Sequence, residues 1–416
     1  MTITSFYLIG KAGDVLIEKH HRSPLPRSVL DPLQEEITKA SRHEDVPSVV
    51  SGPKHYLINI LRENIFYVGV CPSEVPPLFV IELLRRIVSI FENYLGTAPK
   101  EKLVRREAVL LYQLLEEVVD NGFPLTTEPN VLEALIMKPT VLNMALRGVG
   151  RKKTVEDTLP SGQLSATHWR KSNVKYSTNE CFIDVEEHVS AIVSRSGNPV
   201  TASAKGKVIC RCHLSGMPDC TLSFADGGRC LDDISLHPCV RIARWQNERI
   251  MSFIPPDGKF ELAGYRVYNV PTLPFNIRGM VNYKQAGGGR IEIDISPKGA
   301  VVCDNVELAV EFPKAVNGVT VNTSFGNWSF EELTKTLRWT IRKLPERETQ
   351  TLRGSVSLAV SEAIPDGNPT IQANFRVQGA TASGLKVKEL IIYNEKYRAY
   401  KGVKYVSMAD DYQVRM

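Results

Sequence analysis

The sequence contains no uninterrupted apolar run that could cross a lipid bilayer, which needs about 20 mostly apolar residues. Its most apolar segment, residues 75–95, is interrupted by Pro76, Pro77, Glu82, Arg85, Arg86 and Glu92. The first eleven residues have no basic stretch followed by an apolar core, so they do not resemble a secretory signal peptide. We therefore expect a cytosolic protein whose contact with membranes is peripheral.

Motifs for phosphate binding and covalent catalysis are also missing. Gly10 and Gly13 lack the lysine and hydroxyl residue that end a P-loop, and the glycines at 287–289 precede no predicted helix. No G-x-S-x-G sequence is present. The 51 Lys and Arg against 46 Asp and Glu give a net charge of +5, small for a dedicated nucleic-acid binder. The sequence thus predicts no enzyme, no cofactor and no nucleic-acid partner.

The eight cysteines raise the question of a metal site, because six of them lie between residues 181 and 239. Cys210 and Cys212 have C-x-C spacing, whereas structural zinc sites favour C-x₂₋₄-C pairs. On a strand these two cysteines would share one face and His213 would lie on the other. Buried cysteines that act as small hydrophobic residues explain the pattern better, so no metal is predicted. A zinc enzyme built on residues 210–239 is the remaining alternative.

The first third of the chain predicts mixed α and β structure from its apolar periodicity and turn residues. The predicted elements are a hairpin of residues 3–9 and 15–18, a second strand pair of residues 56–61 and 65–70, and helices over residues 79–94, 101–120 and 130–137. Gly96 is expected to end the first helix.

The character changes after residue 147. Residues 147–166 are rich in Gly, Lys and Arg and predict an exposed linker. From Trp169 onward, short apolar alternations are separated by turn sequences such as Asp226-Gly227-Gly228, which predicts an all-β sandwich. Its roughly 247 residues are many for one sandwich, so two β subdomains are expected. The predicted fold class is α+β.

Cations interleave with apolar residues near the C-terminus. They are Lys386, Lys388, Lys396, Arg398, Lys401 and Lys404. Strand alternation is expected to bring many of them to one exposed face. That face is either simply solvated or a site for anionic lipid headgroups or an acidic partner.

Several blocks of the sequence resemble the medium (mu) subunits of adaptor protein complexes. They are Trp169-Arg170, residues 174–176 (VKY), 179–185 (NECFIDV), 214–219 (LSGMPD), 252–258 (SFIPPDG), 231–241 (LDDISLHPCVR), 402–406 (GVKYV) and 121–124 (NGFP). The run 252–258 is the most specific of these. The blocks at 231–241 and 402–406 are most similar to the third adaptor type.

The resemblance implies three parts: a longin-like domain over residues 1–140, a flexible basic linker over 141–168, and a mu homology domain over 169–416. The first would dock to a large beta-type adaptin, within a heterotetramer that also contains a second large adaptin and a small sigma subunit. The last would be an elongated two-part sandwich that binds Tyr-x-x-Φ signals, where Φ is a bulky hydrophobic residue, in the tails of membrane cargo. The third type serves transport from endosomal or trans-Golgi membranes towards lysosomes. An anionic, phosphoinositide-bearing membrane surface is a further expected partner.

The resemblance also assigns two pockets. For the signal tyrosine, Asp184 would accept the phenol hydroxyl, Phe182 would form a ring wall, and Arg211 and Lys404 would occupy the basic positions. A phosphate on the tyrosine would face Asp184, so phosphotyrosine should be rejected. The hydrophobic-signal pocket would consist of Cys181, Ile183, Val387, Leu390 and Val403.

Two positions depart from the family pattern. Gly402 stands where other adaptor classes carry a tryptophan wall of the tyrosine pocket, and Cys181 stands where they carry a leucine. The third type shares the glycine, so weaker or differently selective binding is expected. The alternative is a coat scaffold subunit that has lost tyrosine-signal binding.

Overall fold

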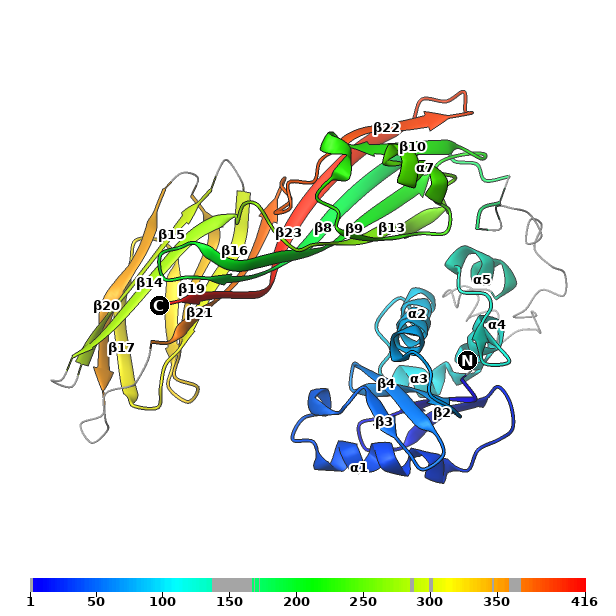
Figure 1. Ribbon diagram of the computed structural model, residues 1–416, viewed down its shortest axis with the longest axis horizontal. Coiled ribbons are helices and arrows are strands. Elements are labelled where there is room, and N and C mark those ends of the chain that lie inside the picture. Colours follow the sequence, from blue (N-terminus) through cyan, green and yellow to red (C-terminus); the bar gives the residue numbers. More distant parts are fainter. Residues whose placement is uncertain are drawn as a thin grey trace, which may run out of the picture. The chain divides into compact units, whose positions relative to one another are not determined.

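The computed structural model describes residues 3–136, 167, 169–171, 173–284, 288–298, 302–345, 348–358 and 368–416. Contacts within the chain divide it into two compact units, Met1–Trp169 and Arg170–Met416. Almost all of the predicted linker 141–168 lies outside the described residues. Figure 1 shows helices and a sheet in the first unit and mainly strands in the second, which confirms the α+β class. No helix of the described ranges is long and apolar enough to span a membrane.

The first unit is built on one antiparallel sheet with strand order β2-β1-β5-β4-β3. Its strands are β1 (Ser5–Ile9), β2 (Val15–His20), β3 (Val49–Ser51), β4 (Tyr56–Arg62) and β5 (Ile65–Cys71). Its helices are α1 (Asp31–Lys39), α2 (Pro77–Leu95), α3 (Glu101–Arg106), α4 (Ala108–Val118) and α5 (Pro129–Leu135), with 3₁₀ turns η1 (Arg27–Leu30) and η2 (His43–Asp45). The β1–β2 and β4–β5 pairs confirm both predicted strand pairs.

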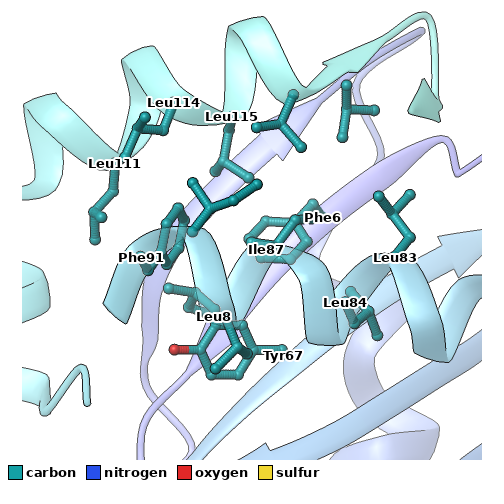
Figure 2. Packing of buried hydrophobic residues seen from close by; sticks show 14 of the residues in the cluster. Phe6, Leu8, Tyr67, Leu83, Leu84, Ile87, Phe91, Leu111, Leu114 and Leu115 are labelled. Carbon is teal, nitrogen blue, oxygen red and sulfur yellow. The ribbon is translucent and has the colours of Figure 1, made fainter. Parts of the chain in front are cut away.

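Both faces of this sheet are covered, because alternate residues of a strand project to opposite sides. One apolar cluster joins the sheet to α2 and α4; it includes Phe6, Leu8, Tyr67, Ile87, Phe91 and Leu111, which are labelled in Figure 2. A second cluster joins the other face to the η1–α1 segment; it includes Tyr7, Ile9, Phe66, Leu30 and Leu33.

The predicted continuous helix over residues 101–120 is wrong. Glu107 has φ −103° and ψ 20°, outside the helical region, and separates α3 from α4. The last two predicted residues form β6 (Val119–Asp120), which pairs with β7 (Phe123–Pro124). The turn between them uses Gly122 at φ +86°, where a Cβ would lie 2.1 Å from the Ile3 carbonyl oxygen. Apolar periodicity continues through this segment, but tertiary contacts decide where its helix ends.

The second unit contains a nine-stranded sheet of order β11-β13-β9-β8-β23-β21-β16-β19-β18, a three-stranded sheet β12-β10-β22 and a four-stranded sheet β14-β15-β20-β17. The strands are β8 (Glu180–Val193), β9 (Pro199–His213), β10 (Asp219–Phe224), β11 (Asp233–Leu236), β12 (Ile250–Phe253), β13 (Gly258–Val267), β14 (Phe275–Lys284), β15 (Gly288–Pro297), β16 (Val302–Glu311), β17 (Val316–Thr323), β18 (Asn327–Glu331), β19 (Thr336–Leu344), β20 (Gln350–Leu358), β21 (Thr370–Gln378), β22 (Val387–Tyr393) and β23 (Tyr400–Arg415). Among the described residues of this unit, a 3₁₀ turn, η3 (Ala225–Gly228), and a helix that the sequence did not predict, α7 (Ile242–Glu248), interrupt the strands.

The long strands β8, β9 and β23 give this unit its elongated form (Figure 1). Near one end of the unit lie β10, β22 and α7; at the other end lies the four-stranded sheet (Figure 1). Between the four-stranded and nine-stranded sheets, the ring of Phe275 packs edge-on against that of Phe375, with ring centres 4.8 Å apart. Within the nine-stranded sheet, Phe375 packs in the same way against Tyr412, with ring centres 5.2 Å apart. The predicted two-part sandwich is confirmed.

The start of the second unit is fixed by a buried cation, Arg170, whose side chain is 0% exposed. Its guanidinium donates to the carbonyl oxygens of Gly216 at 2.8 Å and Pro255 at 3.1 Å, and also to that of Leu214. Its Nη1 lies 3.9 Å from the carboxylate of Asp257. The specific run at 252–258 thus contributes an acceptor and a counter-charge for this arginine.

Candidate functional site

Seven of the ten predicted pocket residues lie at the N-terminal ends of β8 and β23, which pair in parallel. The other three are Arg211 on β9 and Val387 and Leu390 on β22. Along β8 the side chains alternate strictly, and Cys181 and Ile183 are buried on one face while Phe182 and Asp184 are partly exposed on the other. The structure therefore separates the ten candidate residues into two groups on opposite sides of one sheet.

The tyrosine-pocket candidates form one group. Arg211 on β9 and Gly402 on β23 flank Phe182, while Lys404 lies beside Asp184. Nη2 of Arg211 lies 3.2 and 3.0 Å from the two carboxylate oxygens of Asp184. The same guanidinium lies 5.8 Å from the centre of the Phe182 ring. The Asp184 side chain is 15% exposed and the Arg211 side chain 46% exposed, so this ion pair opens to solvent through the arginine.

Gly402 and Phe182 fit each other closely. A Cβ added to Gly402 would lie 2.8 Å from Cδ1 and 3.0 Å from Cε1 of the Phe182 ring. The aromatic ring therefore already covers the space above the glycine, and a tryptophan at position 402 would have to displace it.

The hydrophobic-signal candidates form the other group. Cys181 and Ile183 are 0% exposed and lie under the surface. Val403 pairs with Ile183 in the sheet and is 39% exposed. Leu390 of β22 is 6% exposed, and Val387 of the same strand is half-buried. The accessible apolar surface of this group thus comes from β22 and β23, over a base formed by β8.

One side of β23 is open beside both groups. Within the described ranges, β21 pairs with β23 only from Val406 onward, and no strand pairs with that side of residues 400–404. Tyr400 donates its N–H to the segment preceding β8 at 2.9 Å. Since the bonding direction alternates along a parallel pair, the backbone groups of Lys401 and Val403 point to the open side. An extended peptide could add there as a further strand.

Two residues of the site were missed by sequence reasoning. Lys401 and Tyr405 occupy the positions on either side of Val403 that share its face of β23, and both bind β22. Counting by twos from Val403 would have found them.

The C-terminal cations, many of which were expected on one face, do not all lie on the same face. All six are exposed, but Lys401 and Lys404 are an odd number of residues apart on β23 and point to opposite faces. Only Lys404 lies on the face of Asp184.

Seven of the eight cysteines are buried. As predicted, Cys210 and Cys212 share one face of β9, which is buried, and His213 lies on the other. Nδ1 of His213 lies 3.1 Å from Oε1 of Glu180. The hydrogen bond between the sulfurs of Cys181 and Cys210, 3.8 Å apart, and burial raise the pKa of Cys181. In the part of the chain that the structure describes, no three His, Cys, Asp or Glu side chains are grouped to hold a metal.

Comparison with known proteins shows which solved structure this fold resembles and to which family the chain belongs. The fold matches a structure described as a homology model of the full-length AP-3 complex in an intermediate open conformation, with TM-score 0.66, 16% identity and 99% of each chain covered. The model of the adaptor complexes medium subunit family matches residues 167–416, and the chain belongs to this family. It is 43% identical over 418 residues to AP-3 complex subunit mu-2 of Rattus norvegicus, covering 99% of this chain and 100% of the relative. It is also 43% identical over 419 residues to AP-3 complex subunit mu-1 of Gallus gallus, with the same coverage. The predicted resemblance to medium subunits, most like the third type, is confirmed.

Proposed function

We propose that the second unit binds Tyr-x-x-Φ signals in the cytosolic tails of membrane proteins, as the cargo-binding part of an AP-3-type adaptor complex. The observation that carries this proposal is the position of the two candidate pockets on opposite faces of the sheet, beside the open side of β23. Tyr and Φ are three residues apart, an odd spacing, so on an extended strand they project to opposite faces. A peptide strand added to β23 would therefore direct one side chain into each group.

The chemistry of each face suits its side chain. From the open side, a tyrosine ring would pack against the Phe182 ring, which lies over Gly402. Its hydroxyl would donate to Asp184, because a carboxylate has about four acceptor positions and Arg211 leaves some of them available. On the opposite face a Φ side chain would lie on Val403 below β22.

The test is a calorimetric titration of the full chain with a Tyr-x-x-Φ peptide and its Ala-x-x-Φ counterpart. We expect the tyrosine peptide to bind at least about tenfold more tightly, because the ring fills a pocket and its hydroxyl gains an ionised acceptor. The same peptide phosphorylated on tyrosine should lose this advantage, since a phosphate would face Asp184. Equal affinity for the tyrosine and alanine peptides would contradict the proposal and favour a coat scaffold without signal binding.

We further propose that the chain acts as a binding subunit, not an enzyme, within a heterotetramer. Residues 1–140 would dock to a large beta-type adaptin, beside a second large adaptin and a small sigma subunit. Residues 141–168 would serve as the linker to the cargo-binding part, residues 169–416. The complex would act on the cytosolic face of Golgi and endosomal membranes, in transport towards lysosome-type organelles. Exposed cations such as Lys386 and Lys388 suit contact with anionic phosphoinositide headgroups.

Exposed apolar residues of the first unit support the docking proposal. Val109 and Tyr112 are one helical turn apart on α4 and are 75% and 38% exposed, and Leu125 is 65% exposed. We expect Val109→Glu to lower capture of co-expressed beta-type adaptin by about tenfold, because a charge would be buried at the contact. Val200→Glu, at a 56% exposed site of the second unit, is the matched control. Unchanged capture by the Val109 variant would exclude this face of α4 as the contact surface for the beta-type adaptin.

A further inference from the structure

Two polar side chains of β23 bind β22, which supplies Val387 and Leu390 of the hydrophobic-signal group. Lys401 donates from Nζ to the carbonyl oxygen of Leu390 at 2.8 Å. The N–H of Val387 donates to the hydroxyl oxygen of Tyr405 at 2.9 Å. Alternate residues of a strand share a face, so Lys401, Val403 and Tyr405 lie on one face of β23. The two contacts therefore lie on either side of Val403.

The chain leading into β22 is held by a third residue, Glu187, which is 0% exposed on β8. Its carboxylate accepts the N–H of Ser383 at 3.1 Å and the hydroxyl of Tyr265 at 2.8 Å. It also accepts the hydroxyl of Ser383. Ser383 lies four residues before β22, so the start of this strand is tied to the core of the nine-stranded sheet.

β22 itself is an edge strand, paired along one side with β10. The segment leading into β22 is thus held by Glu187 of β8, and β22 itself is joined to β23 by Tyr405 and Lys401. Val403 lies exposed on β23 between these two contacts. A hydrogen bond weakens steeply when its length or angle changes, so these contacts favour one position of β22.

We propose that Lys401 and Tyr405 are positioning residues that set the width of the hydrophobic-signal pocket, and with it the size of Φ side chain that this chain accepts. The inference rests on the proposed binding of Tyr-x-x-Φ signals. Neither residue is required to touch the signal tyrosine, which lies on the opposite face. Loss of either contact lets β22 move away from β23. The affinity for a signal with a large Φ side chain then rises relative to that for a signal with a compact one.

The experiment measures the affinities of full-length variants for two tyrosine peptides that differ only at Φ, one with Leu and one with Phe. Tyr405→Phe and Lys401→Met each remove one polar group and keep the apolar part of the side chain. We expect each to lower the ratio of Leu-peptide to Phe-peptide affinity by about threefold to tenfold. Lys401→Arg keeps a donor and should retain most of the wild-type ratio.

Tyr268→Phe is the matched control, because it removes a tyrosine hydroxyl that donates to Asp233 at 2.5 Å, on strand β11 away from β22. It should leave the ratio unchanged. If Tyr405→Phe weakens both peptides equally while the wild type still requires the signal tyrosine, the residue is merely structural and the inference fails, but the proposed function stands. If the wild type binds neither peptide, both are overturned.

Discussion

Asp184→Ala is expected to weaken binding of a Tyr-x-x-Φ peptide by about tenfold to 100-fold, because a hydrogen bond to a charged group contributes about 1.5–3 kcal/mol. The Asp184 carboxylate lies on the same face of β8 as Phe182, and Arg211 already positions it. The measurement is calorimetric titration of the full chain and the variant.

A double-mutant cycle with a Phe-x-x-Φ peptide shows whether the hydroxyl is responsible. Phenylalanine has no hydroxyl, so Asp184→Ala should change its affinity by less than about twofold. Glu186→Ala is the control on the protein, since Glu186 lies on the same face of β8, two residues further along. An equal loss for both peptides would mean that Asp184 supports the pocket and does not contact the signal.

Arg170→Met is expected to lower the free energy of unfolding of the second unit by about 3–5 kcal/mol, because two buried carbonyl oxygens and one part-buried carbonyl oxygen lose a donor. A neighbouring hydrogen bond does not involve Arg170 and stays intact: the Tyr176 hydroxyl donates to the Asp257 carboxylate at 2.7 Å. Burial and this hydrogen bond raise the pKa of Tyr176 to about 12, which keeps its hydroxyl protonated at neutral pH. Urea unfolding monitored by circular dichroism would show the loss as a lower midpoint with an unchanged slope.

Arg195→Met provides the comparison, because Arg195 is exposed in the β8–β9 turn and its replacement should cost less than about 0.5 kcal/mol. Arg170→Lys keeps the charge but loses the planar group that reaches several carbonyls, so an intermediate loss is expected. A loss below about 1 kcal/mol for Arg170→Met would show that water replaces the guanidinium at these carbonyls.

Apolar periodicity and turn residues predicted most of the helices and strands of the first unit. The Phe79–Tyr94 pattern corresponds to α2, which ends at Gly96 with φ +73°, because left-handed backbone favours glycine. Short elements were missed: α1 has little apolar repetition, and the seven residues of α7 are too few to establish a period. The break at Glu107 could not be predicted, since the apolar repeat continues across it.

For the site, the sequence by itself determined that Phe182 and Asp184 share one strand face with Ile183 on the other, because alternation is a local property of β structure. The sequence also determined, through its motifs, the family to which the chain belongs. Only the tertiary structure decided that β23 pairs in parallel with β8, which brings residues 402–404 beside residues 182–184 from more than 200 positions away. It alone decided that one side of β23 stays open and that Lys401 and Tyr405 hold β22, because strand neighbours and hydrogen-bond partners distant in the chain are set by packing, which local periodicity does not encode.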